Sequence, residues 1–242
     1  MIKIRGLHKS FGAVKVLNGV DLHIPYGKTT VILGRSGVGK SVLLKHIIGL
    51  IRPDRGKVWI DGEDITRLGD KDLNEMRKRF GMLFQEAALF DSMNVGANVA
   101  FPLREHTNLN DKDIRGIVAQ KLEQVGLTGL EEKMPAELSG GMKRRVGLAR
   151  ALVLDPEIVL FDEPTAGLDP PMAEAIEELI LETQQRLGKT FVVITHSIRT
   201  AFHIGNQIAM LHEGKIVEEG TPRAFRRSSN PVVQTFMARE ER

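Results

Sequence analysis

The chain has 242 residues, of which 42% are hydrophobic and 27% charged, a composition typical of an ordinary soluble globular protein with one domain, or one domain and a subdomain. Its 34 lysines and arginines only slightly exceed its 31 acidic residues, so no nucleic-acid partner is implied. It has no cysteine, hence no disulfide framework, and no stretch approaches the roughly 20 uncharged apolar residues of a membrane span. The N-terminus also lacks the apolar region of a signal peptide, so we expect a cytoplasmic chain that reaches a membrane only through a partner.

The first third of the chain is predicted to contain strands around one helix. Residues 20–24 alternate apolar with polar side chains, and residues 58–60 run into the turn pair Asp61-Gly62, which predicts an antiparallel β portion. Residues 29–33 form a short apolar strand that leads into a glycine-rich turn and then a helix over residues 40–50. The predicted buried side of this helix comprises Leu43, Leu44, Ile47 and Ile48.

The remainder of the chain is predicted to place a helical insert between strands. Residues 80–84 are predicted to form a strand, whereas residues 87–154 lack convincing strands and are predicted to be helical, most clearly over 111–125. Further strands are predicted over residues 158–161, 191–195, 208–211 and 215–217, before a charged and partly helical tail over 223–242. The pattern therefore predicts an α/β core that is interrupted by helices.

A phosphate-binding loop is predicted directly after the strand over residues 29–33. It comprises Gly34, Arg35, Ser36, Gly37, Val38, Gly39, Lys40 and Ser41, a full match to the pattern G-x-x-x-x-G-K-[ST]. The glycines let successive N–H groups turn inward around the β-phosphate, Lys40 supplies positive charge to the β- and γ-oxygens, and Ser41 offers its hydroxyl to Mg²⁺. Because a strand precedes the loop and a helix follows it, a merely structural glycine-rich turn is disfavoured.

Polar side chains follow three other predicted strands. Asp162 and Glu163 come directly after residues 158–161, where open α/β sheets bind their ligands, and we expect Asp162 to hold Mg²⁺ and Glu163 to deprotonate the attacking water. Adjacent acids also occur in ordinary loops, and the upstream phosphate-binding loop is what favours the catalytic interpretation. Gln85 is expected to bind Mg²⁺ or the water, and His196 to contact the γ-phosphate. The remaining histidines lack metal-ligand spacing.

The pentapeptide LSGGM, residues 138–142, allows two interpretations. Two glycines after a small hydroxyl residue let a backbone approach a phosphate closely, and residues 142–151 are predicted to begin a helix whose N-terminus favours an anion. In the other interpretation, Ser139 is a plain helix N-cap.

In this order, and together with Leu168-Asp169, the motifs resemble those of the nucleotide-binding subunit of an ABC transporter over about residues 1–237. The resemblance implies an ATPase that uses ATP and Mg²⁺, and a head-to-tail dimer in which each ATP lies between the phosphate-binding loop of one copy and the LSGG segment of the other. It also implies nucleotide contacts by Phe11, Val42, Ser139, Gly140, Gly141 and Asp169. Phe11 would stack on adenine, although a phenylalanine before a glycine is also typical of a packing residue.

The resemblance implies an α/β fold, with a RecA-like P-loop NTPase core, an antiparallel β portion and an inserted α-helical subdomain. We predict that residues 1–86 and 155–242 form the ATP-binding core. Residues 87–154 are predicted to form the helical subdomain that carries LSGGM.

Several segments resemble the lipid-transport branch of this family, the MlaF type, which energises phospholipid movement between bacterial membranes and so maintains outer-membrane lipid asymmetry. These segments are residues 39–50, 84–90, 93–95 and 101–107, together with LSGGM, whose Met142 stands where most family members have glutamine. The resemblance implies a permease of the MlaE type, an MCE-domain protein and in some systems a STAS-domain protein, at the cytoplasmic face of the inner membrane. Residues 86–103 are expected to bind the permease. Their apolar side chains also fit a helical core, namely Leu89, Phe90, Val95, Val99 and Phe101.

Three other functions share part of this pattern. An ATPase for import of amino acids or other small solutes has the same nucleotide motifs, but LSGGM and residues 103–107 disfavour it. A DNA-repair or chromosome ATPase has both the phosphate-binding loop and the LSGG segment. It usually also carries long insertions, for which this chain has no room. A regulator of the cell-division type has this size, and only its partner distinguishes it.

Overall fold

The computed structural model describes residues 1–240 and contains two compact units. The first unit comprises Met1–Arg77 and the chain from Gln184 onward, and the second comprises Lys78–Thr183. Residues 241 and 242, which the predicted core domain includes, lie outside the described residues. The domain boundaries at residues 87 and 154 stay a prediction.

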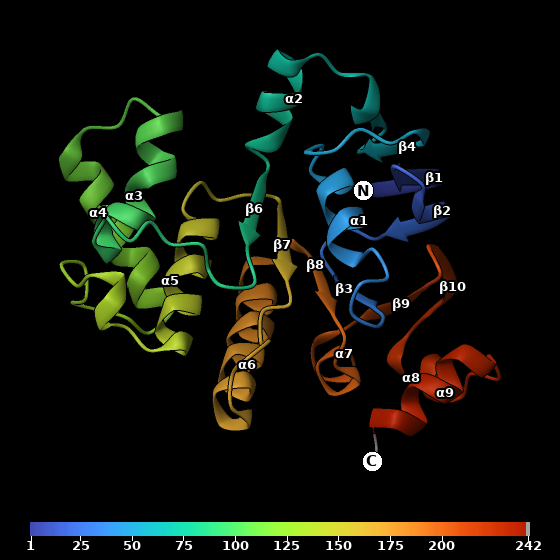
Figure 1. The fold of residues 1–242 in the computed structure, drawn as a ribbon. Helices are drawn as coiled ribbons and strands as arrows, with labels where there is room; N and C mark the ends of the chain where they lie inside the picture. Colours follow the sequence, from blue (N-terminus) through green and yellow to red (C-terminus); the bar gives the residue numbers. More distant parts are fainter. Residues whose placement is uncertain (241–242) are drawn as a thin grey trace. The chain divides into compact units, whose positions relative to one another are not determined.

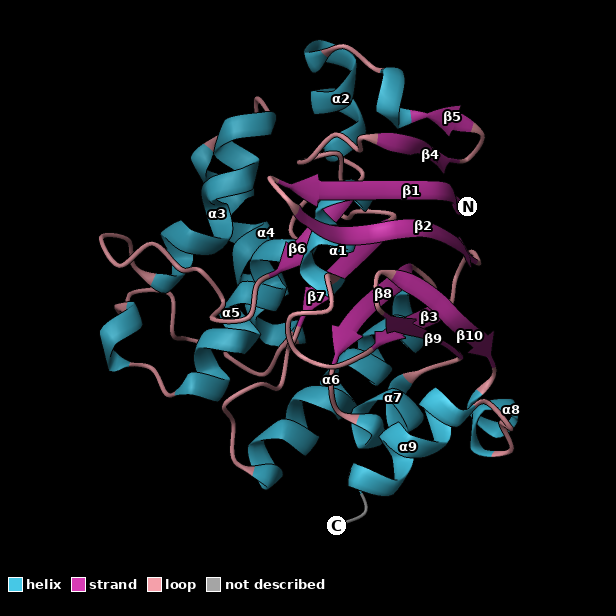
Figure 2. Ribbon diagram, turned by 45° about the vertical axis from the view of Figure 1, so that its right-hand side comes forward, coloured by secondary structure: helices cyan, strands magenta, loops and turns pink. Residues whose placement is uncertain are grey.

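The first unit contains an antiparallel sheet with the strand order β2-β1-β4-β5 (Figure 2). Its strands are β1 (Ile2–Phe11), β2 (Val14–Ile24), β4 (Arg55–Ile60) and β5 (Glu63–Asp64). Alternate apolar side chains such as Ile4, Leu22 and Val58 are buried, so one face of the sheet packs inward. At the predicted turn pair, Asp61 and Gly62 have φ angles of 49° and 88°, and the pairing of β4 with β5 across them confirms the hairpin.

In the first unit, the strand that leads into the predicted phosphate-binding loop has a partner strand on each side. β3 (Thr29–Leu33) pairs in parallel with β8 (Thr190–Thr195) and with β9 (Gln207–His212), and β10 (Lys215–Gly220) pairs antiparallel with β9. Every residue of β3 and β8 is buried, as is typical of parallel strands covered on both faces. The helices of this unit include α1 (Lys40–Ile47), the 3-10 helix η1 (Ile65–Arg67), α2 (Asp70–Arg77), α7 (Ile198–Ile204), α8 (Pro222–Arg226) and α9 (Pro231–Glu240).

Helix α1 ends at Ile47, earlier than the predicted residue 50. Gly49 has a left-handed φ of 69°, and a Cβ at this position would lie 2.6 Å from Leu73 Cδ1, so the helical geometry stops here. Three of the four predicted buried residues are fully buried, but Ile48, which lies beyond the end of the helix, is only half-buried.

The second unit combines two parallel strands with a group of helices (Figure 1). β6 (Phe80–Leu83) pairs with β7 (Ile158–Asp162). Every regular element between them is helical, as predicted: α3 (Val95–His106), α4 (Asp111–Gln124), the 3-10 helix η2 (Pro135–Glu137) and α5 (Gly140–Leu152). α6 (Pro170–Leu187) then leads the chain back into the first unit. Over residues 1–240, none of the helices is both long and apolar enough to cross a membrane.

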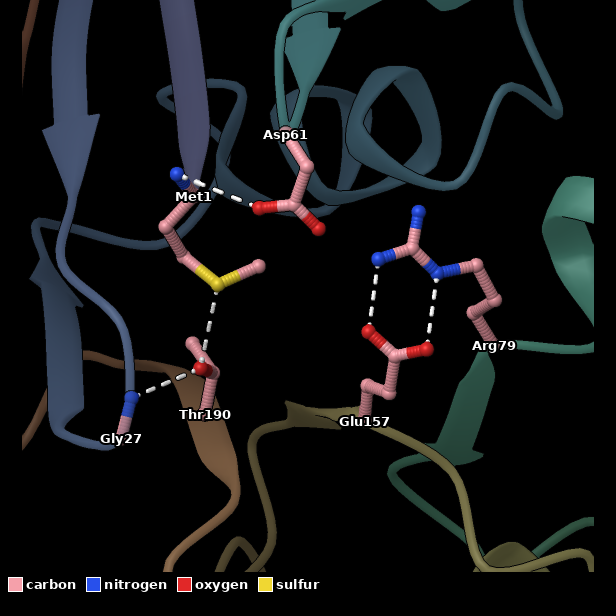
Figure 3. A network of polar contacts seen from close by, with 6 residues as sticks. All are labelled: Met1, Gly27, Asp61, Arg79, Glu157 and Thr190. Atoms are coloured by element: carbon pink, nitrogen blue, oxygen red, sulfur yellow. Dashed lines mark hydrogen bonds and ion pairs between the residues drawn. The ribbon is translucent and has the colours of Figure 1, made fainter.

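Polar contacts fix the starts of the parallel strands within each unit (Figure 3). In the first unit, Thr190 at the start of β8 accepts a hydrogen bond of 2.9 Å from the Gly27 N–H and donates one of 3.3 Å to the Met1 sulfur. In the second unit, the Arg79 guanidinium donates two hydrogen bonds, of 3.1 and 2.6 Å, to the carboxylate of Glu157. Arg79 and Glu157 precede β6 and β7, so this ion pair joins the two strands at the end opposite to the candidate catalytic residues.

Candidate active site

Two glycines of the predicted phosphate-binding loop lie where no side chain fits. Gly34 follows β3, and a Cβ on it would lie 2.5 Å from the carbonyl oxygen of Leu211. Gly39 has a left-handed φ of 104°, and a Cβ there would lie 2.9 Å from a methyl carbon of Val16. The path of the loop between β3 and α1 therefore requires glycine at both positions.

The N-terminus of α1 is arranged to receive an anion. Its N-cap, Gly39, provides no side-chain hydrogen bond, so the first N–H groups of the helix are not capped by that residue. The Lys40 side chain is 5% exposed, and its Nζ donates to the carbonyl oxygens of Gly34 and Arg35 at 2.8 and 3.1 Å. No atom lies within 4 Å of a Cβ built on Gly37, whose φ is 80°, so there is open space beside the loop at this residue. These features fit a polyphosphate.

His196 lies at the same sheet edge as the phosphate-binding loop. In the parallel pair of β3 and β8, Leu33 stands opposite Thr195, and the Gly34 N–H donates a 3.3 Å hydrogen bond to the Thr195 carbonyl oxygen. His196 is the next residue after β8, and it is exposed. Its position beside the start of the loop is the one that the sequence predicts.

Phe11 is the last residue of β1 and does not belong to the core. Its side chain is 49% exposed, and the ammonium group of Lys9 lies 5.5 Å from the ring centroid. The packing alternative for Phe11 is therefore wrong, since an exposed ring at the end of a strand is available to stack on a flat ligand.

The second unit brings Gln85, Asp162 and Glu163 to one edge of its parallel strand pair. Leu83 at the end of β6 stands opposite Phe161 in β7, so the residues that follow both strands emerge at the same edge. Asp162 ends β7 half-buried, and Gln85 is exposed in the loop after β6. Glu163 is only 9% exposed and has a left-handed φ of 48°. A residue with a side chain rarely adopts this geometry unless its surroundings impose it, and no signal in the sequence predicted it.

The helix-cap interpretation of LSGGM is correct. Ser139 is the N-cap of α5, and its Oγ accepts a 3.3 Å hydrogen bond from the Met142 N–H. Ser139 and Gly140 are nevertheless exposed, whereas Gly141 is buried so tightly that a Cβ on it would lie 2.1 Å from the Met172 sulfur. Ser139 and Gly140 therefore also present an exposed hydroxyl and backbone at a helix N-terminus. The interpretation in which LSGGM contacts a phosphate stays a prediction.

Asp169 stands immediately before α6. Its Oδ1 accepts a 3.1 Å hydrogen bond from the Met172 N–H, and its carbonyl oxygen accepts from the Ala173 N–H at 2.9 Å. In this structure the exposed Asp169 carboxylate therefore caps the start of a helix.

The predicted site residues are distributed over the two units. The first unit holds the phosphate-binding loop with Val42, which is half-buried in α1, as well as Phe11 and His196. The second unit holds Gln85, Asp162, Glu163, Asp169 and the LSGG segment.

The chain belongs to the ABC transporter family, whose profile matches residues 17–166. It is an ATP-binding subunit of that family and hydrolyses ATP, with a P-loop core, an antiparallel β portion and a helical subdomain. The fold class and the activity predicted from the sequence are thus confirmed.

Curated relatives match almost the whole chain. It is 48% identical, over 98% of its length, to the probable ribonucleotide transport ATP-binding protein mkl of Mycobacterium leprae, of which it spans 68%. It is 42% identical, over 99% of its length, to the intermembrane phospholipid transport system ATP-binding protein MlaF of Haemophilus influenzae, of which it spans 91%. It is 41% identical, over 98% of its length, to the chloroplastic protein TRIGALACTOSYLDIACYLGLYCEROL 3 of Arabidopsis thaliana, of which it spans 73%.

Among solved structures, the chain resembles a dimeric ATP-binding cassette in a post-hydrolysis state, bound to ADP and Pi. The TM-score is 0.84 at 33% sequence identity, and the match covers 92% of this chain and 99% of the other.

Proposed function

We propose that this ABC ATPase energises phospholipid transport between the inner and outer membranes of a bacterium, as a peripheral subunit on the cytoplasmic side of a membrane permease. The observation that carries the proposal is the 42% identity to the MlaF protein of Haemophilus influenzae over 99% of the chain. Met142 and residues 84–90 and 101–107, the segments that resemble the MlaF type, support the same cargo.

The proposed hydrolysis gives a separate role to the residues of each unit. In the first unit, the loop N–H groups and Lys40 would hold the phosphates, Phe11 would stack on adenine and His196 would contact the γ-phosphate. In the second unit, the buried Glu163 would orient the attacking water and accept its proton.

The proposed magnesium site draws on donors of mixed type. Within the described residues, no group of three or more histidine, cysteine, aspartate or glutamate side chains gathers in a form that could hold a metal. The half-buried Ser41 hydroxyl, the Gln85 amide and the half-buried Asp162 carboxylate fit Mg²⁺, which binds few protein ligands and keeps waters and phosphate oxygens. When bound, the ion would neutralise charge that develops on the β- and γ-phosphates.

A second copy of the chain is proposed to complete each site. The exposed Ser139 and Gly140 at the N-terminus of α5 would contact the phosphates held by the partner copy, and Asp169 would link the two sites. The solved relative with ADP and Pi is dimeric, which supports this assembly.

The permease is proposed to bind at residues 86–103. Three of the apolar side chains assigned to a possible core in this region prove peripheral, since Phe90 is 41% exposed and Leu89 and Phe101 are half-buried. Val95 and Val99 are fully buried. The exposed side chains fit an MlaE-type permease, which an MCE-domain protein and in some systems a STAS-domain protein would accompany.

A second candidate cargo is a small polar solute. The Mycobacterium leprae relative, at 48% identity, is named for ribonucleotide transport. This name favours transport of a small solute over the DNA-repair and cell-division alternatives, which no specific observation supports.

The deciding experiment is reconstitution of the complex that co-purifies with the chain. We expect MgATP to drive phospholipid movement between labelled vesicles, measured in both directions, and no uptake of ribonucleotide. Glu163→Gln is the matched control, which should bind ATP but move no lipid, because the proposed general base is absent. ATP-driven ribonucleotide uptake without lipid movement would exclude the proposed cargo.

A further inference from the structure

A buried arginine on the LSGGM helix holds the loop that follows Glu163. Arg144 lies in α5 and is 8% exposed. Its Nε donates a 3.2 Å hydrogen bond to the Pro164 carbonyl oxygen, and its Nη2 donates a 3.0 Å hydrogen bond to the Ala166 carbonyl oxygen. One guanidinium group thus binds two points of a single loop.

The loop that Arg144 holds is a tight turn that begins at Glu163. The Ala166 N–H donates a 3.1 Å hydrogen bond to the Glu163 carbonyl oxygen, with Pro164 and Thr165 between them. Glu163 itself has a left-handed φ of 48°. Because the turn begins at Glu163, a contact that holds the turn also restrains the backbone that carries the Glu163 carboxylate.

The contacts of Arg144 do not have the pattern expected of a purely stabilising residue. Burial lowers the pKa of the Arg144 guanidinium, and the carboxylate of Glu86 only partly opposes this effect. Its two hydrogen-bond partners are neutral carbonyls, so the desolvated charge is incompletely compensated. An arginine does provide the rigid planar donor fork that fixes two acceptors relative to each other.

Close packing fixes the helix from which Arg144 projects. One turn before it, a Cβ on Gly141 would lie 2.1 Å from the Met172 sulfur. One turn after it, a Cβ on Gly147 would lie 2.7 Å from Leu83 Cδ1. Since residues three apart share a helix face, Gly141, Arg144 and Gly147 form a seam that permits little movement of the guanidinium.

We infer that Arg144 is a positioning residue for ATP hydrolysis, which holds the 163–166 turn so that the Glu163 carboxylate points at the attacking water. The inference rests on the proposed role of Glu163. It also connects the LSGG segment to the general base, because Ser139 and Arg144 belong to the same helix end.

The test compares Arg144→Lys with Arg145→Lys in the full chain, assayed for MgATP hydrolysis with the membrane subunits that co-purify. Lysine keeps the charge but cannot span both carbonyls, so we expect kcat to fall by about 10- to 100-fold while KM for ATP changes by less than about threefold. Arg145 is the matched control, because its Nη1 donates to the Val125 carbonyl oxygen at 3.0 Å and not to the 163–166 turn. Its variant should keep kcat within about twofold of wild type. Arg144→Gln replaces Arg144→Lys if the latter fails to fold.

A double variant separates positioning from a general loss of structure. If Arg144 acts through Glu163, the Arg144→Lys, Glu163→Gln chain should hydrolyse ATP no more slowly than Glu163→Gln alone. The inference would be overturned if the kcat of the double variant fell below that of Glu163→Gln by the same factor that Arg144→Lys alone causes. It would also be overturned if Arg144→Lys kept wild-type kcat while Glu163→Gln was inactive, and in that case the proposed function would stand. Wild-type turnover by Glu163→Gln would instead remove the proposed role of Glu163 itself.

Discussion

At the level of single residues, three residues with side chains adopt left-handed geometry beside the candidate catalytic groups. Glu163 has a φ of 48°, and Ala87 and Ala88, in the loop after β6, have φ angles of 61° and 46°. Each such residue costs roughly 1–3 kcal/mol, so tertiary contacts must hold it. Arg144 binds the loop after Glu163, and Arg150 donates to the carbonyl oxygens of Ala87 and Ala88 at 2.6 and 2.8 Å. Both arginines project from α5.

His46 is predicted to make the stability of the chain fall in mild acid. Burial lowers the pKa of His46 below its ordinary value of 6.5, and the hydrogen bond from its Nδ1 to the Val42 carbonyl oxygen, 2.7 Å long, only partly opposes this. As the pH falls through 6.5, the unfolded chain therefore takes up a proton before the folded chain does. The free energy of unfolding should then decrease by up to about 1.4 kcal/mol per pH unit, whereas above this range His46 contributes no pH dependence.

Urea unfolding at pH 7.5, 6.5 and 5.5 checks this expectation. His46→Asn should flatten the dependence below pH 6.5, because asparagine keeps a donor for the Val42 carbonyl and does not titrate. The exposed His106 is the matched control, and His106→Asn should keep the wild-type slope. Equal slopes in wild type and His46→Asn would show that another group is responsible.

At the level of elements, α5 is predicted to support the permease-binding segment as well as the LSGG segment. Arg150 lies near its C-terminal end and binds Ala87 and Ala88, at the start of the proposed permease-binding segment over residues 86–103. Arg150→Ala should lower the free energy of unfolding by roughly 2 kcal/mol, since hydrogen bonds from a charged donor are lost. It should also reduce permease co-purification more than Arg145→Ala, which loses only the contact with Val125. Undiminished recovery of the permease with Arg150→Ala would refute this role.

The elements that the sequence predicted share a strong local pattern. β3, β7 and β8 are short, and each contains a run of three or four consecutive apolar residues. Residues 34–41 have a diagnostic spacing of glycine, lysine and serine. Helices α6 and α7 were not predicted. α6 begins with two prolines, which resemble a turn, although proline is well tolerated in the first turn of a helix.

Strand β1 was also missed, because its pattern breaks in the middle. Ile2 and Ile4 alternate with exposed Lys3 and Arg5, but the pairing register with β2 shifts between Ile4 and Leu7. A bulge of this kind places side chains out of the strict two-residue period on which the prediction depends.

The candidate site was predictable only as a set of side chains at strand ends. Gln85, Asp162 and His196 were expected there, because carboxyl ends of parallel strands meet at one edge. The left-handed φ of Glu163 and the two hydrogen bonds from Arg144 were not, since both depend on contacts between segments distant in sequence.

At the level of the whole molecule, neither unit holds every residue that the account requires. Lys40, Ser41 and His196 belong to the first unit, whereas Asp162 and Glu163 belong to the second. The LSGG segment is proposed to serve the nucleotide of another copy. Hydrolysis is therefore expected to depend on the pairing of two chains. A chain with a defective phosphate-binding loop should be complemented only by a partner whose loop is intact.

Trans-complementation of Lys40→Met by Ser139→Asp tests whether each nucleotide site is shared between two chains. Lys40→Met removes the charge in the phosphate-binding loop, and Ser139→Asp keeps a good N-cap for α5 but places a negative charge where the partner's phosphate should lie. Each variant alone should be inactive, and Ser139→Asn, which caps without charge, should stay active. Mixed dimers, purified through a different tag on each copy, contain one complete site and should recover about half of wild-type ATP turnover. Mixed dimers as inactive as either parent would contradict the shared site.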